Sequence, residues 1–211
     1  MKNKKSISVE FWNGVFGLLS FISIFWLIKK LIKNKSSNWW YDFVDIWVLS
    51  NLALSITSVF LIKLLNFSFL NELLIIYGLL RVFEIIIYQI NVLLFDEYRA
   101  RKSGKIYQIR GYRRMIINLF TNFVEITFWF ASTYAVYLTS ISDQEMSIAH
   151  LIYSSFSTIT TFGISELTIK NETGLFILWF QSIAGLLMTL LSISRFIGLL
   201  PRVESLDEFE E

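Results

Sequence analysis

Long apolar stretches dominate the pattern of hydrophobic and polar residues along the chain. A helix that crosses a bilayer needs about 20 predominantly apolar residues. Five stretches approach or exceed that length: 11–28, 46–62, 73–95, 115–142 and 173–194. Backbone groups surrounded by lipid must be hydrogen-bonded within their own segment, so each stretch is predicted to be a helix.

A sixth stretch, 146–165, has a different pattern. It contains no Asp, Glu, Lys or Arg, yet eight of its residues are Ser or Thr, and Gly163 interrupts it near its end. So many hydroxyls do not suit a helix that faces lipid, and irregular backbone at membrane depth requires surrounding protein or water. We therefore expect a re-entrant half-helix followed by a loop. The predicted fold class is an all-α integral membrane protein with about five hydrophobic helices and this half-helix.

The composition supports a membrane protein. Hydrophobic residues make up 55% of the 211 residues, and charged residues only 17%, against about 25% in soluble domains. A soluble domain of this size would leave large apolar patches exposed. The absence of Cys and the single His, His150, exclude disulfides and a cluster of transition-metal ligands. A net charge of +2 gives no reason to expect nucleic acid as a partner.

Basic residues predict the orientation in the membrane. Loop 96–114 carries seven Lys and Arg residues, so it is expected in the cytoplasm; residues 99–114 are also a candidate contact for anionic lipid headgroups. The acidic tail 201–211 then lies in the cytoplasm as well, and loop 142–149 lies outside. Stretch 11–28 is short and leaves two alternatives. Either it crosses and puts the N-terminus outside, or it does not fully cross. The Lys-, Ile- and Asn-rich usage suggests a bacterial cell membrane.

The run 153–163 has the residue types that an ion path requires. A short helix can point its partially negative C-terminal end at an ion. The backbone that follows can offer carbonyl oxygens in place of the ion's water shell, and glycine allows the backbone conformations with positive φ that turn carbonyls inward. Thr160, Thr161, Phe162 and Gly163 follow a Ser/Thr-rich helical segment in that order.

This run resembles the pore of potassium channels in the family of tetrameric P-loop cation channels. The residues that match the family pattern Tyr-x-Ser-x-x-Thr-x-Thr-Thr-Val-Gly-Tyr-Gly-Asp in register are Tyr153, Ser155, Thr158, Thr160, Thr161 and Gly163. Gly174 and Gly185 resemble glycines of the family's inner helix, and 194–198 resembles its small-Arg-x-x-Gly ending. The resemblance covers about residues 115–200.

The resemblance implies a role for each matched residue. The pore half-helix would contain Tyr153, Ser155, Thr158 and Thr160, and Gly185 would be the hinge of the inner helix. The permeant ion, K⁺ or Na⁺, would bind in a filter formed by Thr161, Phe162, Gly163, Ile164 and Ser165, with the Thr161 hydroxyl at its cytoplasmic edge. The chain would assemble with itself as a homotetramer in the lipid bilayer.

The outer part of the filter departs from the family pattern. Ile164, Ser165 and Glu166 stand where the family has Tyr-Gly-Asp. Glu166 keeps an acidic group at the outer mouth. Ile164 lacks the supporting hydroxyl, and a left-handed conformation at Ser165 would cost roughly 1–2 kcal/mol. The sequence therefore predicts a potassium-permeable channel with weakened selectivity over sodium. The alternative is an effector or partner subunit that has a degenerate channel fold and depolarises membranes or scaffolds another protein.

The remaining polar residues in the apolar stretches suggest structure rather than catalysis. Arg81 and Glu84 are three residues apart and can pair on one helix face. Glu125 is expected either to be protonated or to bond to the inner helix. No nucleophile has a base at helical spacing, so neither an enzyme nor a cofactor is predicted. The expected organisation is 1–95 as N-terminal membrane helices, 96–114 as a basic linker, 115–200 as the pore domain and 201–211 as a tail.

Overall fold

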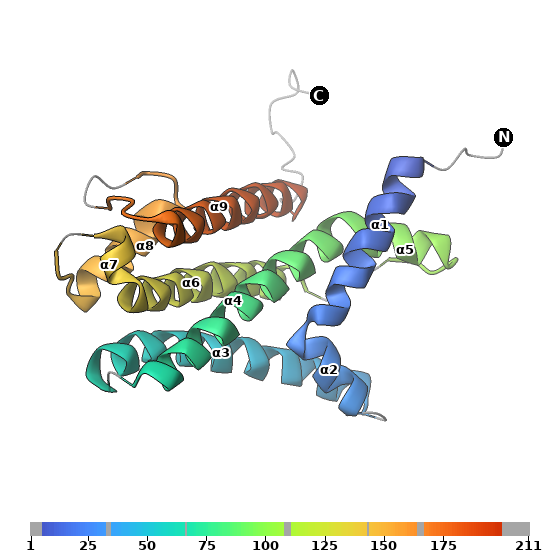
Figure 1. The fold of residues 1–211 in the computed structure, drawn as a ribbon. Helices are drawn as coiled ribbons and strands as arrows, with labels where there is room; N and C mark the ends of the chain where they lie inside the picture. Colours follow the sequence, from blue (N-terminus) through green and yellow to red (C-terminus); the bar gives the residue numbers. More distant parts are fainter. Residues whose placement is uncertain are drawn as a thin grey trace, which may run out of the picture.

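The computed structural model describes residues 6–32, 35–65, 67–107, 111–142, 144–163 and 167–199. These residues form helices and connecting loops, with no strand among them (Figure 1). The α-helices in chain order are α1 (Ile7–Leu19), α2 (Ile24–Leu31), α3 (Ser37–Leu65), α4 (Ser68–Ile90), α5 (Asp96–Lys102), α6 (Tyr112–Val136), α7 (Leu138–Ile141), α8 (Ile148–Ile159) and α9 (Glu172–Leu199). A 3₁₀ turn, Ser20–Ile22, separates α1 from α2, and a π-helical turn, Asn91–Phe95, joins α4 to α5.

Four helical segments are long and apolar enough to cross a membrane, which confirms four of the five stretches read from the sequence. They are Ser37–Leu65, Ser68–Lys102, Arg113–Val136 and Glu172–Gly198. The expected span 115–142 is shorter than predicted, because α6 ends at Val136 and α7 follows after a break at Tyr137. Helices α1 and α2 pass the same criterion only as a pair, and they are bent by 72° relative to each other.

The first part of the expected loop 96–114 is helical instead. Helix α5 continues α4 through the π-helical turn, and the whole helical segment runs to Lys102. Most residues of α5 favour helix, and an i,i+4 ion pair of 2.5 Å between Glu97 and Arg101 adds to this. The charges of this segment indicate a loop, but its helical propensity prevails. The helix ends before Gly104, which has a φ of +70°.

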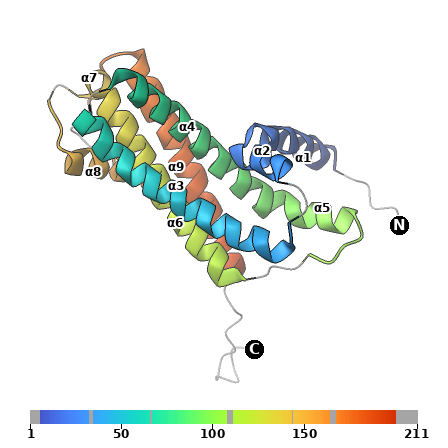
Figure 2. The same ribbon diagram turned by 90° about the horizontal axis from the view of Figure 1, so that it is seen from below.

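Helices α3, α4, α6 and α9 form an elongated bundle (Figures 1 and 2). Helix α3 packs along α6, and α4 packs on both α6 and α9. Val82, Phe130 and Met188 meet in the core between α4, α6 and α9. Gly78 allows α4 to approach α6 closely, since a Cβ at this position would lie 2.8 Å from Cδ2 of Trp129.

The two ends of the bundle hold different elements. At one end, called the α8 end, the turn between α3 and α4 lies near α7, α8 and the start of α9 (Figure 2). At the other, the α5 end, Arg114 at the start of α6 donates to Asp45 of α3 at 2.7 Å. There Arg195 near the end of α9 donates to the carbonyl of Gln89 in α4 at 3.3 Å. The expected cytoplasmic loop and the last turn of α9 thus lie at one end, as the orientation requires.

Helices α1 and α2 enter and leave the bundle at the same end. Helix α1 runs antiparallel to α5 and α4, with Glu10 3.4 Å from Lys102 and Asn13 2.7 Å from Arg99. It reaches only as far as Glu84, whose carboxylate accepts from the Ser23 hydroxyl at 2.5 Å. The chain then turns, and α2 leads back to the start of α3. Both alternatives for stretch 11–28 stay open, because a pair bent in this way is either a broken span or a re-entrant segment.

A buried cluster of charges joins this turn to α6. Arg81 lies 3.2 Å from Glu84, which confirms the predicted pair. Glu125 also binds Arg81, at 2.8 Å, and accepts from Nε1 of Trp129 at 3.2 Å. Of the two alternatives expected for Glu125, the bond to the inner helix is therefore wrong, because its carboxylate faces Arg81 of α4 and Trp129 of its own helix.

Candidate functional site: the segment after helix α8

Helix α8 is a short helix that ends deep within the bundle. It packs on α6 and α9, and the Ser147 hydroxyl accepts from the amide of His150 to cap its first turn. Its last residue, Ile159, contacts Gly185, which lies 13 residues into α9. At 1.5 Å per residue, this is about 20 Å from the start of α9. The half-helix predicted within 146–165 is confirmed as an element, with bounds Ile148–Ile159.

A buried network of polar groups holds α8 in place. The Ser155 hydroxyl donates to the carbonyl of Thr127 in α6 at 2.7 Å. Gln181 of α9 donates from Nε2 to the Ser155 carbonyl at 2.8 Å and lies 3.0 Å from its Oγ. The Tyr134 hydroxyl donates to Oε1 of Gln181 and lies 3.4 Å from Oγ1 of Thr158. The network ties α8 to both long helices beside it.

Only part of this network is predicted from the sequence. Ser155 and Thr158 are predicted residues of the half-helix, but Gln181, Tyr134 and Thr127 are not predicted to contact it. One signal was present for Gln181, because it is the only amide in the apolar stretch 173–194. A fully buried amide needs hydrogen-bond partners, so a lone Gln in such a helix indicates a contact with another polar element.

Gly185 allows α9 to pass directly beside the end of α8. A Cβ at Gly185 would lie 3.0 Å from Cα of Ile159 and closer still to its carbonyl oxygen. Such contacts are tighter than real Cβ atoms make, so the close approach requires glycine. This gives Gly185 a packing role, and its role as a hinge stays a prediction.

Two residues after α8, Thr161 and Gly163, have a left-handed backbone conformation. The amide of Thr161 donates to the carbonyl of Thr158 at 3.1 Å, and the amide of Phe162 donates to that of Ser157 at 3.0 Å. This pair of bonds is a Schellman motif, and Thr161 occupies the left-handed position that is usually glycine. Its φ is +63°, and Gly163 follows with a φ of +70°. A β-branched residue at positive φ is an outlier that needs support from its surroundings.

Thr161, the first residue of the predicted filter, also forms the turn that ends α8. The physical reason is that the last carbonyls of a helix need donors, and this turn supplies two. Phe162 is 84% exposed, and Gly163 is exposed too. Ile164, Ser165 and Glu166 lie outside the described residues, as does the tail 201–211.

The other predicted residues of the half-helix, Tyr153 and Thr160, are seven residues apart and so lie on one side of it. Tyr153 is 60% exposed and points away from the bundle core, while the Thr160 hydroxyl donates to the carbonyl of Phe156 at 2.7 Å within α8. Helix α9 is also largely exposed. Only 28% of its apolar 18-residue stretch is buried, against 61% of the corresponding stretch in the segment Ser68–Lys102. A wide apolar surface on α8 and α9 therefore has no cover within a single chain.

No cluster of three His, Asp or Glu side chains that could hold a metal is present among the described residues. A cation at this segment would have to bind to carbonyl and hydroxyl oxygens of 160–163. No protein-family model, curated protein or solved structure gives a significant match to this chain. The interpretation of the segment therefore rests on its own residues and geometry.

Proposed function

We propose that this chain forms a homotetrameric channel for monovalent cations in the cell membrane, permeable to potassium and only weakly selective against sodium. The observation that carries the proposal is the strained segment Thr161–Gly163 at the deep end of α8. Strained backbone conformations cluster at functional sites. Exposed residues at the C-terminal end of a half-helix can offer backbone carbonyls to a cation.

The uncovered surface of α8 and α9 supports self-assembly. A single chain supplies one set of carbonyl oxygens, whereas a filter needs a ring of them around the ion. Exposed side chains on α9 include Phe176, Trp179, Ile183, Leu186 and Leu190. Four copies packed through α8 and α9 would cover part of this surface and bring four segments 161–163 to one axis.

Weak selectivity follows from the residues after Gly163. Selectivity depends on several successive rings of oxygens, through cavity size or through the number and field strength of the ligands. Ser165 in place of glycine and Ile164 in place of tyrosine reduce support for the outer rings. Na⁺ is the smaller ion and binds its water shell more tightly than K⁺. An ion that stays partly hydrated in the filter gives up less hydration free energy, so sodium is admitted as well.

The test is a measurement on purified protein in liposomes. With potassium on one side and sodium on the other, we expect a current whose reversal potential lies between zero and the potassium equilibrium value. Crosslinking in mild detergent should give tetramers as the largest product. Flux that appears only after an accessory protein is added would favour the effector or partner-subunit alternative, and crosslinking that stops at dimers would count against the pore.

A further inference from the structure

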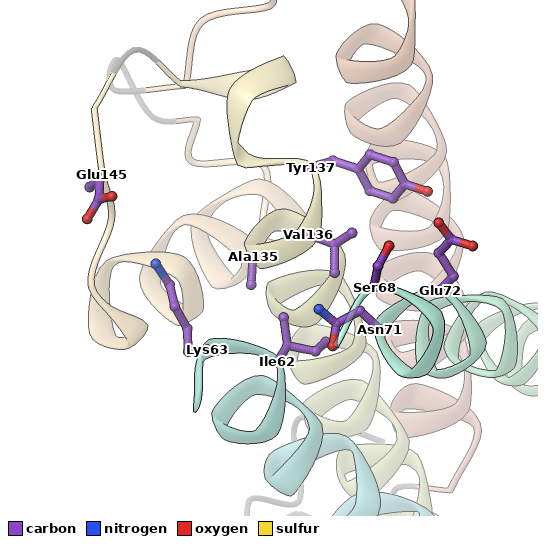
Figure 3. A pocket seen from close by; sticks show the side chains of 9 residues that line it. All are labelled: Ile62, Lys63, Ser68, Asn71, Glu72, Ala135, Val136, Tyr137 and Glu145. Carbon is purple, nitrogen blue, oxygen red and sulfur yellow. The ribbon is translucent and has the colours of Figure 1, made fainter. Parts of the chain in front are cut away.

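A second site of a different kind lies at the α8 end of the bundle, away from segment 160–163. It is a pocket of about 520 Å³ between the end of α3, the start of α4, the end of α6 and the loop before α8. That volume lies within the range of pockets that bind small molecules. The lining residues are Ile62, Lys63, Ser68, Asn71, Glu72, Ala135, Val136, Tyr137 and Glu145 (Figure 3).

One buried amide in the lining lacks a partner. Asn71 is only 8% exposed, and among the described residues nothing donates to its Oδ1. In Figure 3 its amide extends from α4 into the middle of the lining side chains, toward Ile62. A buried acceptor without a donor costs free energy, so this oxygen indicates a donor that the described residues do not supply.

The pocket is also lined by three charged side chains. Lys63 comes from the end of α3, Glu72 follows Asn71 on α4, and Glu145 precedes α8. Within the described part of the chain these three charges form no ion pair with one another. Carboxylates and an amide oxygen accept hydrogen bonds, and an ammonium donates them. A matching ligand has a cationic group with N–H donors and a separate anionic group.

We propose that this pocket binds a small zwitterion, with its N–H-bearing ammonium at Asn71 and Glu72 and its anionic group at Lys63. Ile62, Ala135 and Val136 form the apolar part of the lining and suit a short carbon linker between the two charges. Free phosphoethanolamine and the headgroup of phosphatidylethanolamine present the same chemistry. The site does not depend on the proposed channel function, since no residue of segment 160–163 contributes to it.

The test compares two probes that differ only at the ammonium nitrogen, where three methyl groups replace the three N–H donors. The intact protein in phosphatidylcholine nanodiscs is titrated calorimetrically with phosphoethanolamine and with phosphocholine, whose quaternary ammonium has no N–H donor. We expect phosphoethanolamine to bind at least tenfold more tightly. A parallel experiment uses native mass spectrometry to measure the phosphatidylethanolamine that the protein retains from mixed nanodiscs. Binding in this experiment alone would show that the ligand is the lipid headgroup and not the free molecule.

Variants locate the site. Asn71→Leu should weaken phosphoethanolamine binding, or lipid retention, about tenfold. Glu72→Gln, at an exposed position where folding is not at risk, should weaken it several-fold. Glu97→Gln at the α5 end removes the same charge from an exposed helix and should change nothing. No binding in either experiment, equal binding of the two probes, or equal effects of Glu72→Gln and Glu97→Gln would overturn the proposal.

Discussion

Arg81 of α4 and Glu125 of α6 form an ion pair with two contacts in the core, with Nε–Oε1 and Nη2–Oε2 distances of 2.8 and 3.3 Å. The Glu125 side chain is fully buried, and Arg81 is 4% exposed. Because Glu84 binds both Arg81 and the turn at Ser23, this pair is one link between the α1–α2 unit and the outer helix of the proposed pore.

Replacing Arg81 should be strongly destabilising. Arg81→Met leaves two carboxylates buried without a cation, and breaking a buried pair in this way costs about 3–5 kcal/mol. Adding Glu125→Gln to Arg81→Met should recover part of the loss. The control is Arg101→Met, which removes an exposed ion pair and should cost about 1 kcal/mol or less. The free energy of unfolding in detergent micelles is measured for the wild type and the three variants. Equal losses for Arg81→Met and Arg101→Met would contradict this prediction.

The path of α1 and α2 predicts which positions share a side of the membrane. The chain contains no native Cys, so single Cys residues can be labelled in intact cells with an impermeant reagent. Ile7→Cys and Ser103→Cys should both be protected, because they lie at the α5 end, and Gln144→Cys should be labelled. Labelling of Ile7→Cys together with Gln144→Cys would show that the α1–α2 unit crosses, and labelling of Ser103→Cys would reverse the proposed orientation.

Gln181 should be needed to position α8. Gln181→Met keeps most of the volume but removes the donor to Ser155 and the acceptor for Tyr134, at a cost of about 1–3 kcal/mol. We expect lower cation flux in liposomes as well as lower stability. Ser182→Ala is the neighbouring control, since this exposed hydroxyl donates only to the Leu178 carbonyl of its own helix. Unchanged flux in Gln181→Met would argue against a positioning role.

Gly185→Ala should push α9 away from the end of α8. The added methyl meets backbone atoms of Ile159, and overpacking of this kind costs about 1–3 kcal/mol. Gly14→Ala provides the comparison, because nothing lies within 4 Å of a Cβ there. Helix α1 should gain about 0.5–1 kcal/mol from that change. Thermal unfolding midpoints should therefore move in opposite directions, and a stabilising Gly185→Ala would refute the close approach.

The parts of the fold that follow from local physics were predictable. Stretches such as 46–62 and 173–194 are apolar enough for their helices to be identified from sequence, because the requirement for internal hydrogen bonds acts segment by segment. The half-helix could be predicted for the same reason, since the hydroxyl-rich run before Gly163 does not suit a span. The pairing of Arg81 with Glu84 depends on helical spacing alone.

The remaining features depend on contacts between distant residues. Gln181 and Ser155 are 26 residues apart, and Arg81 and Glu125 are 44 apart, so no local pattern could pair them. The turn at Ser23 depends on a carboxylate 61 residues away, which is why the composition of 11–28 alone left its path open. At Thr161, the need to end α8 decided a backbone conformation that the motif by itself did not predict.

The most direct test of the proposed pore compares two glycines of the same geometry. Gly163 and Gly104 both have a φ of +70°, and a Cβ at either meets nothing within 4 Å among the described residues. Alanine at each position should therefore cost a similar 1–2 kcal/mol or so in backbone strain. Potassium flux into liposomes is the measurement. We expect Gly163→Ala to abolish flux and Gly104→Ala to conduct like the wild type. Equal flux from the two variants, or no flux from the wild type, would contradict the proposed pore.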